Sequence, residues 1–73
     1  MRLIDLRIKV LASHGINVTS HTSMEWLQLA LDTERDKLNC GPFDPAFEWL
    51  SNRQRYFEDA AVIAEILEFR NRG

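Results

Sequence analysis

The chain has 73 residues, which suffices for one small domain, and a folded chain of this size buries only about 60% of the surface that its unfolded form exposes. Its residues are 45% hydrophobic and 27% charged, a balance typical of a folded chain and too apolar for a disordered one. The net charge of -2 offers no overall attraction to phosphates, so nucleic acid is a disfavoured partner. We expect residues 1–73 to form a single helical domain.

Cysteine content and hydropathy limit where the protein works. Cys40 is the only cysteine, which excludes an internal disulfide bond and favours a reducing compartment. No apolar run approaches the roughly 20 residues that a membrane span requires. Charged residues such as Asp5 and Arg7 interrupt the N-terminal apolar residues, unlike the apolar core of a signal peptide. We therefore expect a cytoplasmic protein with no membrane partner.

The first segment, residues 2–14, fits two kinds of secondary structure. Its apolar residues form one broad helical face, but those from Leu6 to Val10 also alternate as in a strand. Gly15 is suited to the left-handed conformation that ends a helix, after which Ile16 can fold back onto Leu11. We favour a helix. The alternative is a β-hairpin that pairs residues 7–11 with residues 16–19, and the β-branched residues there support it.

A second helix is predicted after a polar segment, residues 17–21, that is typical of a linker. Thr22 can cap this helix, and Glu25 can complete a capping box. Gly41 and Pro42 predict its end. The apolar side chains predicted to form its buried face are Met24, Leu27, Leu31 and Leu38, with Trp26 and Ala30 at the margin.

A third helix is predicted to begin at Asp44 and Pro45, a capping carboxylate followed by a proline at the first helical position, and to reach Arg70. Such a helix would be about 40 Å long, so a kink is an alternative within the polar residues 51–55. We favour a continuous helix, because Trp49 and Tyr56 keep a seven-residue register. The residues predicted to face the core are Ala46, Leu50, Phe57, Ala60, Ile63, Ala64 and Leu67. The chain is thus predicted to be an all-α three-helix bundle with a long C-terminal helix.

Val62, Ile66 and Phe69 form a second apolar stripe on this helix, separate from the predicted core face. Charged residues border it, with Glu58 and Glu65 on one side and Asp59 and Arg70 on the other. Two apolar stripes are typical of a helix that packs within its own bundle and also pairs with another chain. We expect the stripe to mediate self-association. The alternative is that the first helix covers it.

Arg53, Arg55 and Tyr56 are the cationic and aromatic residues at the middle of the third helix. An arginine beside an aromatic ring can hold a phosphate or a nucleobase. The cluster therefore supports an alternative function, an oligomer that sequesters a small anionic, nucleotide-like ligand. We expect instead that these side chains have a structural role or contact a partner protein.

No residues suggest catalysis, a cofactor or a metal ion. His14, His21 and Cys40 lie at separate predicted helix ends, and their spacing matches no zinc motif. Cys40 has no recognisable catalytic base. We expect no enzymatic activity.

Residues 11–16 and the helix after them resemble a helix-turn-helix module, in which a glycine ends the first helix. The second helix of such a module enters the major groove of DNA, but here it carries acidic residues including Asp32 and Asp36. The connection is also longer than the usual three or four residues. A DNA-binding regulator is therefore a minor alternative, and no motif in the chain is specific enough to assign a family.

These observations favour a small non-enzymatic protein that binds another protein, as a regulator or inhibitor, and self-associates through its C-terminal helix. Phages and mobile elements encode accessory proteins of this size and composition, and this comparison is an analogy only. The sequence identifies no partner.

Overall fold

The structure is a computed structural model that describes residues 2–72. Its helices are α1 (Leu3–Ser13), the short 3-10 helix η1 (Val18–Ser20), α2 (Ser23–Cys40) and α3 (Pro45–Arg72). No strand occurs in the described part of the chain. The predicted all-α fold with three α-helices is confirmed, and the alternative hairpin of residues 7–11 with 16–19 is wrong.

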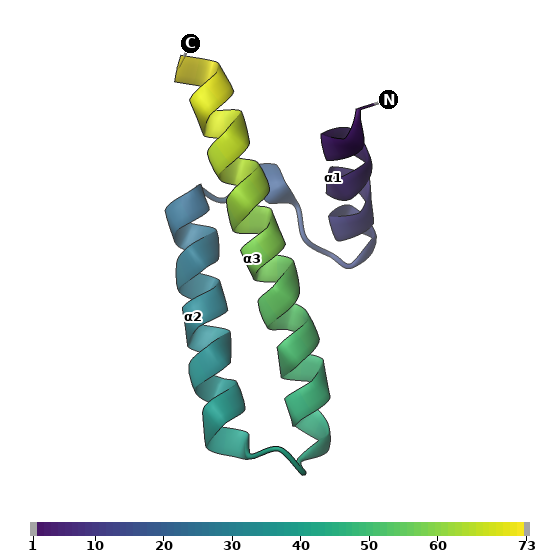
Figure 1. Ribbon diagram of the computed structural model, residues 1–73, viewed down its shortest axis with the longest axis vertical. Helices are drawn as coiled ribbons and strands as arrows, with labels where there is room; N and C mark the ends of the chain where they lie inside the picture. Colours follow the sequence, from purple (N-terminus) through teal and green to yellow (C-terminus); the bar gives the residue numbers. More distant parts are fainter. Residues whose placement is uncertain (1, 73) are drawn as a thin grey trace.

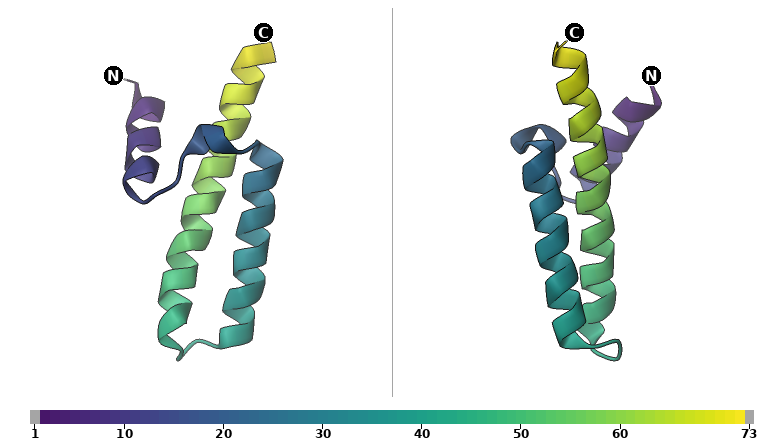
Figure 2. Two further views of the ribbon diagram at one scale, coloured as in Figure 1. Left: turned by 180° about the vertical axis from the view of Figure 1, so that it is seen from behind. Right: turned by 60° about the vertical axis from the view of Figure 1, so that its left-hand side comes forward.

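Helices α2 and α3 form an antiparallel pair joined by a short loop, as Figure 1 shows. The C-terminal part of α3 extends beyond the start of α2, and the short α1 lies beside this part of α3 (Figures 1 and 2). The molecule is elongated, with extents of 45 × 23 × 15 Å. The half of the α2 and α3 pair that is nearer the loop has no third helix beside it.

The helix ends form where local sequence predicts them. At the end of α1, Gly15 has φ 82 and the Ile16 N–H donates to the Leu11 carbonyl over 3.0 Å. At the start of α2, Thr22 and Glu25 form the predicted capping box. Asp44 accepts a hydrogen bond from the Ala46 N–H over 2.9 Å at the start of α3. Each of these interactions joins residues close in sequence, which is why the sequence predicts them.

Helix α3 is one unbroken helix of 28 residues. It continues through residues 51–55, so the favoured continuous helix is confirmed and a break there does not occur. The helix also extends to Arg72, slightly beyond the predicted end at Arg70.

The hydrophobic core lies where α1, η1, α2 and the C-terminal half of α3 meet. Ala60 and Ala64 are buried within it, and small side chains at these positions allow the neighbouring helices to approach closely. The buried hydrophobic residues are Leu11, Ile16, Val18, Trp26, Ala30, Phe57, Ala60, Ile63 and Ala64. On α3 these residues begin only at Phe57, in the middle of the helix, and the described part of the molecule nearer the loop between α2 and α3 has no buried hydrophobic residue.

The segment from residue 17 to residue 21 contributes Val18 to the core, which corrects its prediction as a polar linker, although its other residues are exposed. The Asn17 side chain caps η1 by accepting a hydrogen bond from the Thr19 N–H over 3.2 Å. This turn directs Val18 inward, where its side chain is only 1% exposed. The Trp26 indole N–H donates to the Val18 carbonyl over 2.9 Å, so this buried carbonyl has a hydrogen-bond partner.

The buried face of α2 is also different from the predicted one. Trp26, Ala30 and Thr33 are buried, whereas the predicted core residues Met24, Leu27, Leu31 and Leu38 are exposed. The buried face is thus rotated by about 120°, given about 100° per residue. The large Trp26 ring provides the reason, because it stacks on Phe57 with 5.9 Å between ring centroids. Thr33 tolerates burial because its hydroxyl donates to the Leu29 carbonyl over 2.8 Å.

The first part of the predicted core face of α3 is likewise incorrect. Ala46 is exposed and Leu50 is only half-buried, and the fully buried positions begin at Phe57. These early residues lie beside α2 alone, because α1 packs against the other end of α3.

Candidate interaction surface

The stripe of Val62, Ile66 and Phe69 lies on the surface of α3. Their side chains are 57%, 41% and 77% exposed, respectively, although each is large and apolar. Isolated exposed apolar residues are common, but adjacent ones on a small protein indicate an interaction site. The surroundings of the stripe therefore determine how large this site is.

Three adjoining grooves meet at Val62. The first lies between α2 and α3 and is lined by Met24, Leu27 and Val62. The second follows the stripe itself along α3. The third lies between α1 and α3, where Leu3 and Ile66 contribute to its wall. The exposed residues of these grooves form one surface across three helices, which we call the apolar face: Leu3, Met24, Leu27, Val62, Ile66 and Phe69.

The two edges of the apolar face carry different charges. The groove beside α2 contains Glu58 and Glu65, and these residues form an acidic edge. The groove beside α1 contains Arg2, Arg7 and Arg70, with Asp59 as the only acid in it, and these residues form a basic edge. The face is therefore electrostatically asymmetric, although the whole chain carries a net charge of only -2.

Helix α1 does not cover the stripe. It directs Ile4, Ile8 and Leu11 toward the core, and its other apolar residues Leu3, Leu6 and Val10 are exposed. Val62 and Phe69 also remain more than half exposed beside it. Helix α1 thus adds apolar surface next to the stripe.

Arg53, Arg55 and Tyr56 do not converge on one point. The Arg53 guanidinium lies 5.0 Å from the ring centroids of both Trp49 and Phe57. Tyr56 stacks on His14 with 4.4 Å between ring centroids. Arg55 is exposed, and residues two apart on a helix point in nearly opposite directions. The structure therefore places Arg53 and Tyr56 in contacts within the chain.

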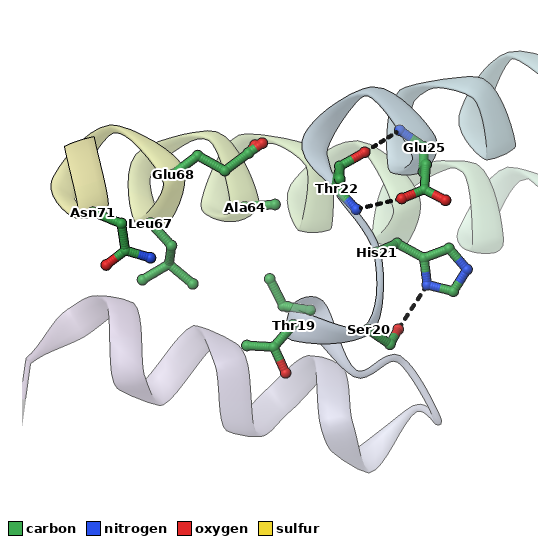
Figure 3. A pocket seen from close by; sticks show the side chains of 10 residues that line it. Thr19, Ser20, His21, Thr22, Glu25, Ala64, Leu67, Glu68 and Asn71 are labelled. Atoms are coloured by element: carbon green, nitrogen blue, oxygen red, sulfur yellow. Dashed lines mark hydrogen bonds between the residues drawn. The ribbon is translucent and has the colours of Figure 1, made fainter.

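A separate groove lies between residues 18–22, the start of α2 and the end of α3 (Figure 3). Glu68 of α3 accepts hydrogen bonds there from the Ser23 hydroxyl over 2.8 Å and from the Ser23 N–H over 3.2 Å. A carboxylate at a helix N-terminus is favourable because the free N–H groups give that end a partial positive charge. Glu68 thus fastens the end of α3 to the start of α2, and its role is structural.

The pKa of Glu25, in the same region, lies below the ordinary value of 4.5. The main cause is the hydrogen bond that the Thr22 N–H donates to its carboxylate, and the Thr22 hydroxyl adds to the effect. This shift reflects the capping box. It does not indicate an acid or base prepared for catalysis.

The possible metal ligands remain apart. His14 stacks on Tyr56, and His21 lies near Ser20 and Trp26, with 2.7 Å between the His21 Nδ1 and the Ser20 hydroxyl oxygen. Cys40 is at the other end of α2. Within residues 2–72 no group of three or more His, Cys, Asp or Glu side chains is arranged to hold a metal ion.

The stripe on α3 is predictable from helical periodicity, but the rest of the apolar face is not. The spacing of Met24 and Leu27 suits a buried helical face, so periodicity predicts that they belong to the core. Leu3 belongs to the broad apolar face predicted for the first helix, and nothing in its spacing gives it a distinct role. The composition gave no signal of this face, because 45% hydrophobic residues is typical of an ordinary folded chain.

Comparisons with known proteins give no relative for this chain: no family model, no curated protein and no solved structure matches it. None of the helices in the described part of the chain is both long enough and apolar enough to cross a membrane.

Proposed function

We propose that this protein is a small cytoplasmic, non-enzymatic regulator or inhibitor that acts by binding protein and self-associates through the apolar face. The exposure of Val62, Ile66 and Phe69 beside Met24 and Leu27 is the observation that supports this proposal most directly. A small chain gains little from leaving such residues in water, because its own core is near the minimum for stability.

The size of the face matters for the energetics. Full burial of one such side chain contributes about 1.5–3 kcal/mol, and association costs about 4–15 kcal/mol in lost freedom. At half of full burial, the stripe alone from two copies would contribute about 5–9 kcal/mol, which barely offsets that cost. Adding Met24 and Leu27 raises the contribution to about 8–15 kcal/mol. Self-association is therefore proposed for the face as a whole.

The experiment is size-exclusion chromatography with light scattering on the native chain and on Ile66→Glu. The native chain is expected to be a dimer at micromolar concentration. The variant is expected to be a monomer with an unchanged far-ultraviolet circular dichroism spectrum, because a carboxylate in the interface has no partner there. Leu38→Glu is a matched control, because Leu38 is 74% exposed on α2 but lines none of the three grooves.

Two results would contradict the proposal. A native chain that is monomeric at high micromolar concentration would mean that the face does not join copies of this chain. Unfolding of Ile66→Glu would mean that Ile66 belongs to the core. The regulatory part of the proposal is tested by comparing the proteins that co-purify from the native host with the native chain and with Ile66→Glu.

A further inference from the structure

The charges at the two edges of the apolar face indicate how two copies meet. We infer that the protein forms a symmetric dimer in which the two α3 helices are parallel and Glu65 of each copy pairs with Arg70 of the other. This inference rests on the proposed self-association. It adds the orientation of the partner and the residues that select it.

The positions along α3 match a short parallel coiled coil. Val62, Ile66 and Phe69 are spaced by four and three residues, as the d, a and d positions of a heptad are. In this register Glu65 is at position g and Arg70 is at the following position e. Residues at e and g pair between the helices of a coiled coil and set their orientation. In a parallel pair, Glu65 of one copy therefore lies beside Arg70 of the other, twice by symmetry.

An antiparallel pair is less favourable for the same side chains. The midpoint of the stripe along α3 lies between Glu65 and Ile66. In an antiparallel pair the two-fold axis is perpendicular to the helices and passes through this midpoint, so it brings the two Glu65 side chains close together. It also places the acidic edges of both copies against each other, and likewise the basic edges. Asp59 with Arg70 would be the attractive contact in that arrangement. Like charges that face each other destabilise a pair of helices, so the parallel orientation is selected.

The edges on the other two helices agree with a parallel dimer. In a parallel dimer the two-fold axis lies between the two α3 helices and is parallel to them. It places the basic edge of one copy, beside α1, on the acidic edge of the other copy, beside α2. The Ser23 contact with Glu68 fixes the start of α2 beside the end of α3, and Leu3 shares a groove with Ile66 and Arg70. Leu3 of one copy is therefore level with Met24 of the other, and Arg2 and Arg7 lie over the acidic edge.

The two charged residues can be reversed without disturbing the monomer. Glu65 and Arg70 are both exposed. Neither has an oppositely charged residue three or four positions away within residues 2–72, where an intrahelical pair would form. A change in the dimer dissociation constant after charge reversal therefore reflects contacts between the two copies.

The test is a charge-reversal cycle, with the dimer dissociation constant measured by analytical ultracentrifugation at low salt. Glu65→Arg and Arg70→Glu are each expected to raise the constant about tenfold, because two symmetric pairs change from attraction to repulsion. The double variant is expected to return to within about threefold of the native value, because the pairs are restored with opposite sign. Lys9→Glu is the control for net charge, since Lys9 lines none of the grooves of the face, and it is expected to leave the constant unchanged.

Mixing the two single variants provides a second readout. A chain with Glu65→Arg and a chain with Arg70→Glu are each mismatched with themselves but complementary to each other, so native mass spectrometry should find mainly the mixed dimer. If Glu65→Arg dimerises as well as the native chain and the double variant does not recover, the parallel arrangement is wrong and the antiparallel one is correct. If the native chain does not dimerise, the proposed self-association itself is wrong.

Discussion

Both faces of α3 carry apolar side chains, but their surroundings differ. On one side Phe57, Ala60 and Ala64 are buried against the other helices, and on the other Val62 and Phe69 are exposed. The exposed side carries the larger residues on average. Close approach of helices, which needs small side chains such as alanine, therefore decides burial here more than apolar size does.

A matched pair of phenylalanine substitutions gives the largest expected contrast. Phe57→Ala should lower the free energy of unfolding by about 3–5 kcal/mol, because Phe57 is only 6% exposed and its loss leaves a cavity under Trp26. Phe69→Ala should change it by no more than about 0.5 kcal/mol in dilute, monomeric protein, because Phe69 is 77% exposed. Urea denaturation followed by circular dichroism measures both.

The same pair should show the opposite order in self-association. Phe69→Ala is expected to weaken the dimer at concentrations where it is still fully folded. If Phe69→Ala destabilises the dilute monomer as much as Phe57→Ala does, the two faces of α3 do not differ in the way described above.

A smaller effect on stability is expected from loss of the buried hydrogen bond between Trp26 and Val18. Trp26→Phe removes the indole N–H that donates to the Val18 carbonyl, and it keeps an aromatic ring in the core. The buried carbonyl then lacks its partner, which costs about 1–3 kcal/mol. The free energy of unfolding from urea titration measures this cost. If the free energy of unfolding hardly changes, water must reach the Val18 carbonyl. The Val18 backbone would then be less buried than its side chain, which is only 1% exposed.

The smallest effect concerns pH and the cap of α2. Because the Glu25 pKa is lowered in the folded chain, its ionised form stabilises the fold above its ordinary pKa of 4.5, and this contribution is lost as the pH falls through the lower folded value. Glu25→Gln should remove this dependence. The difference in urea midpoint between the native chain and Glu25→Gln should therefore be larger at pH 7 than at pH 3. An equal difference at both values would show that the carboxylate charge does not contribute.

The three helices and most of their ends follow from local sequence. The Thr22 and Glu25 capping box, the Asp44 cap and the turn at Gly15 involve residues that are at most a few positions apart, so residue type and spacing are sufficient. The sequence also separated Val62, Ile66 and Phe69 from the core, because helical periodicity alone places them on another side of α3.

Local sequence does not specify which apolar faces are buried. Leu27 and Leu31 fit a core face as well as Trp26 and Ala30 do, and the choice depends on packing against Phe57, far along the chain. The burial of Val18 and the Glu68 contact with Ser23 likewise need partners from distant segments. Periodicity gives the angle between faces of one helix, whereas burial depends on which neighbour comes close, and that follows from the packing of the whole chain.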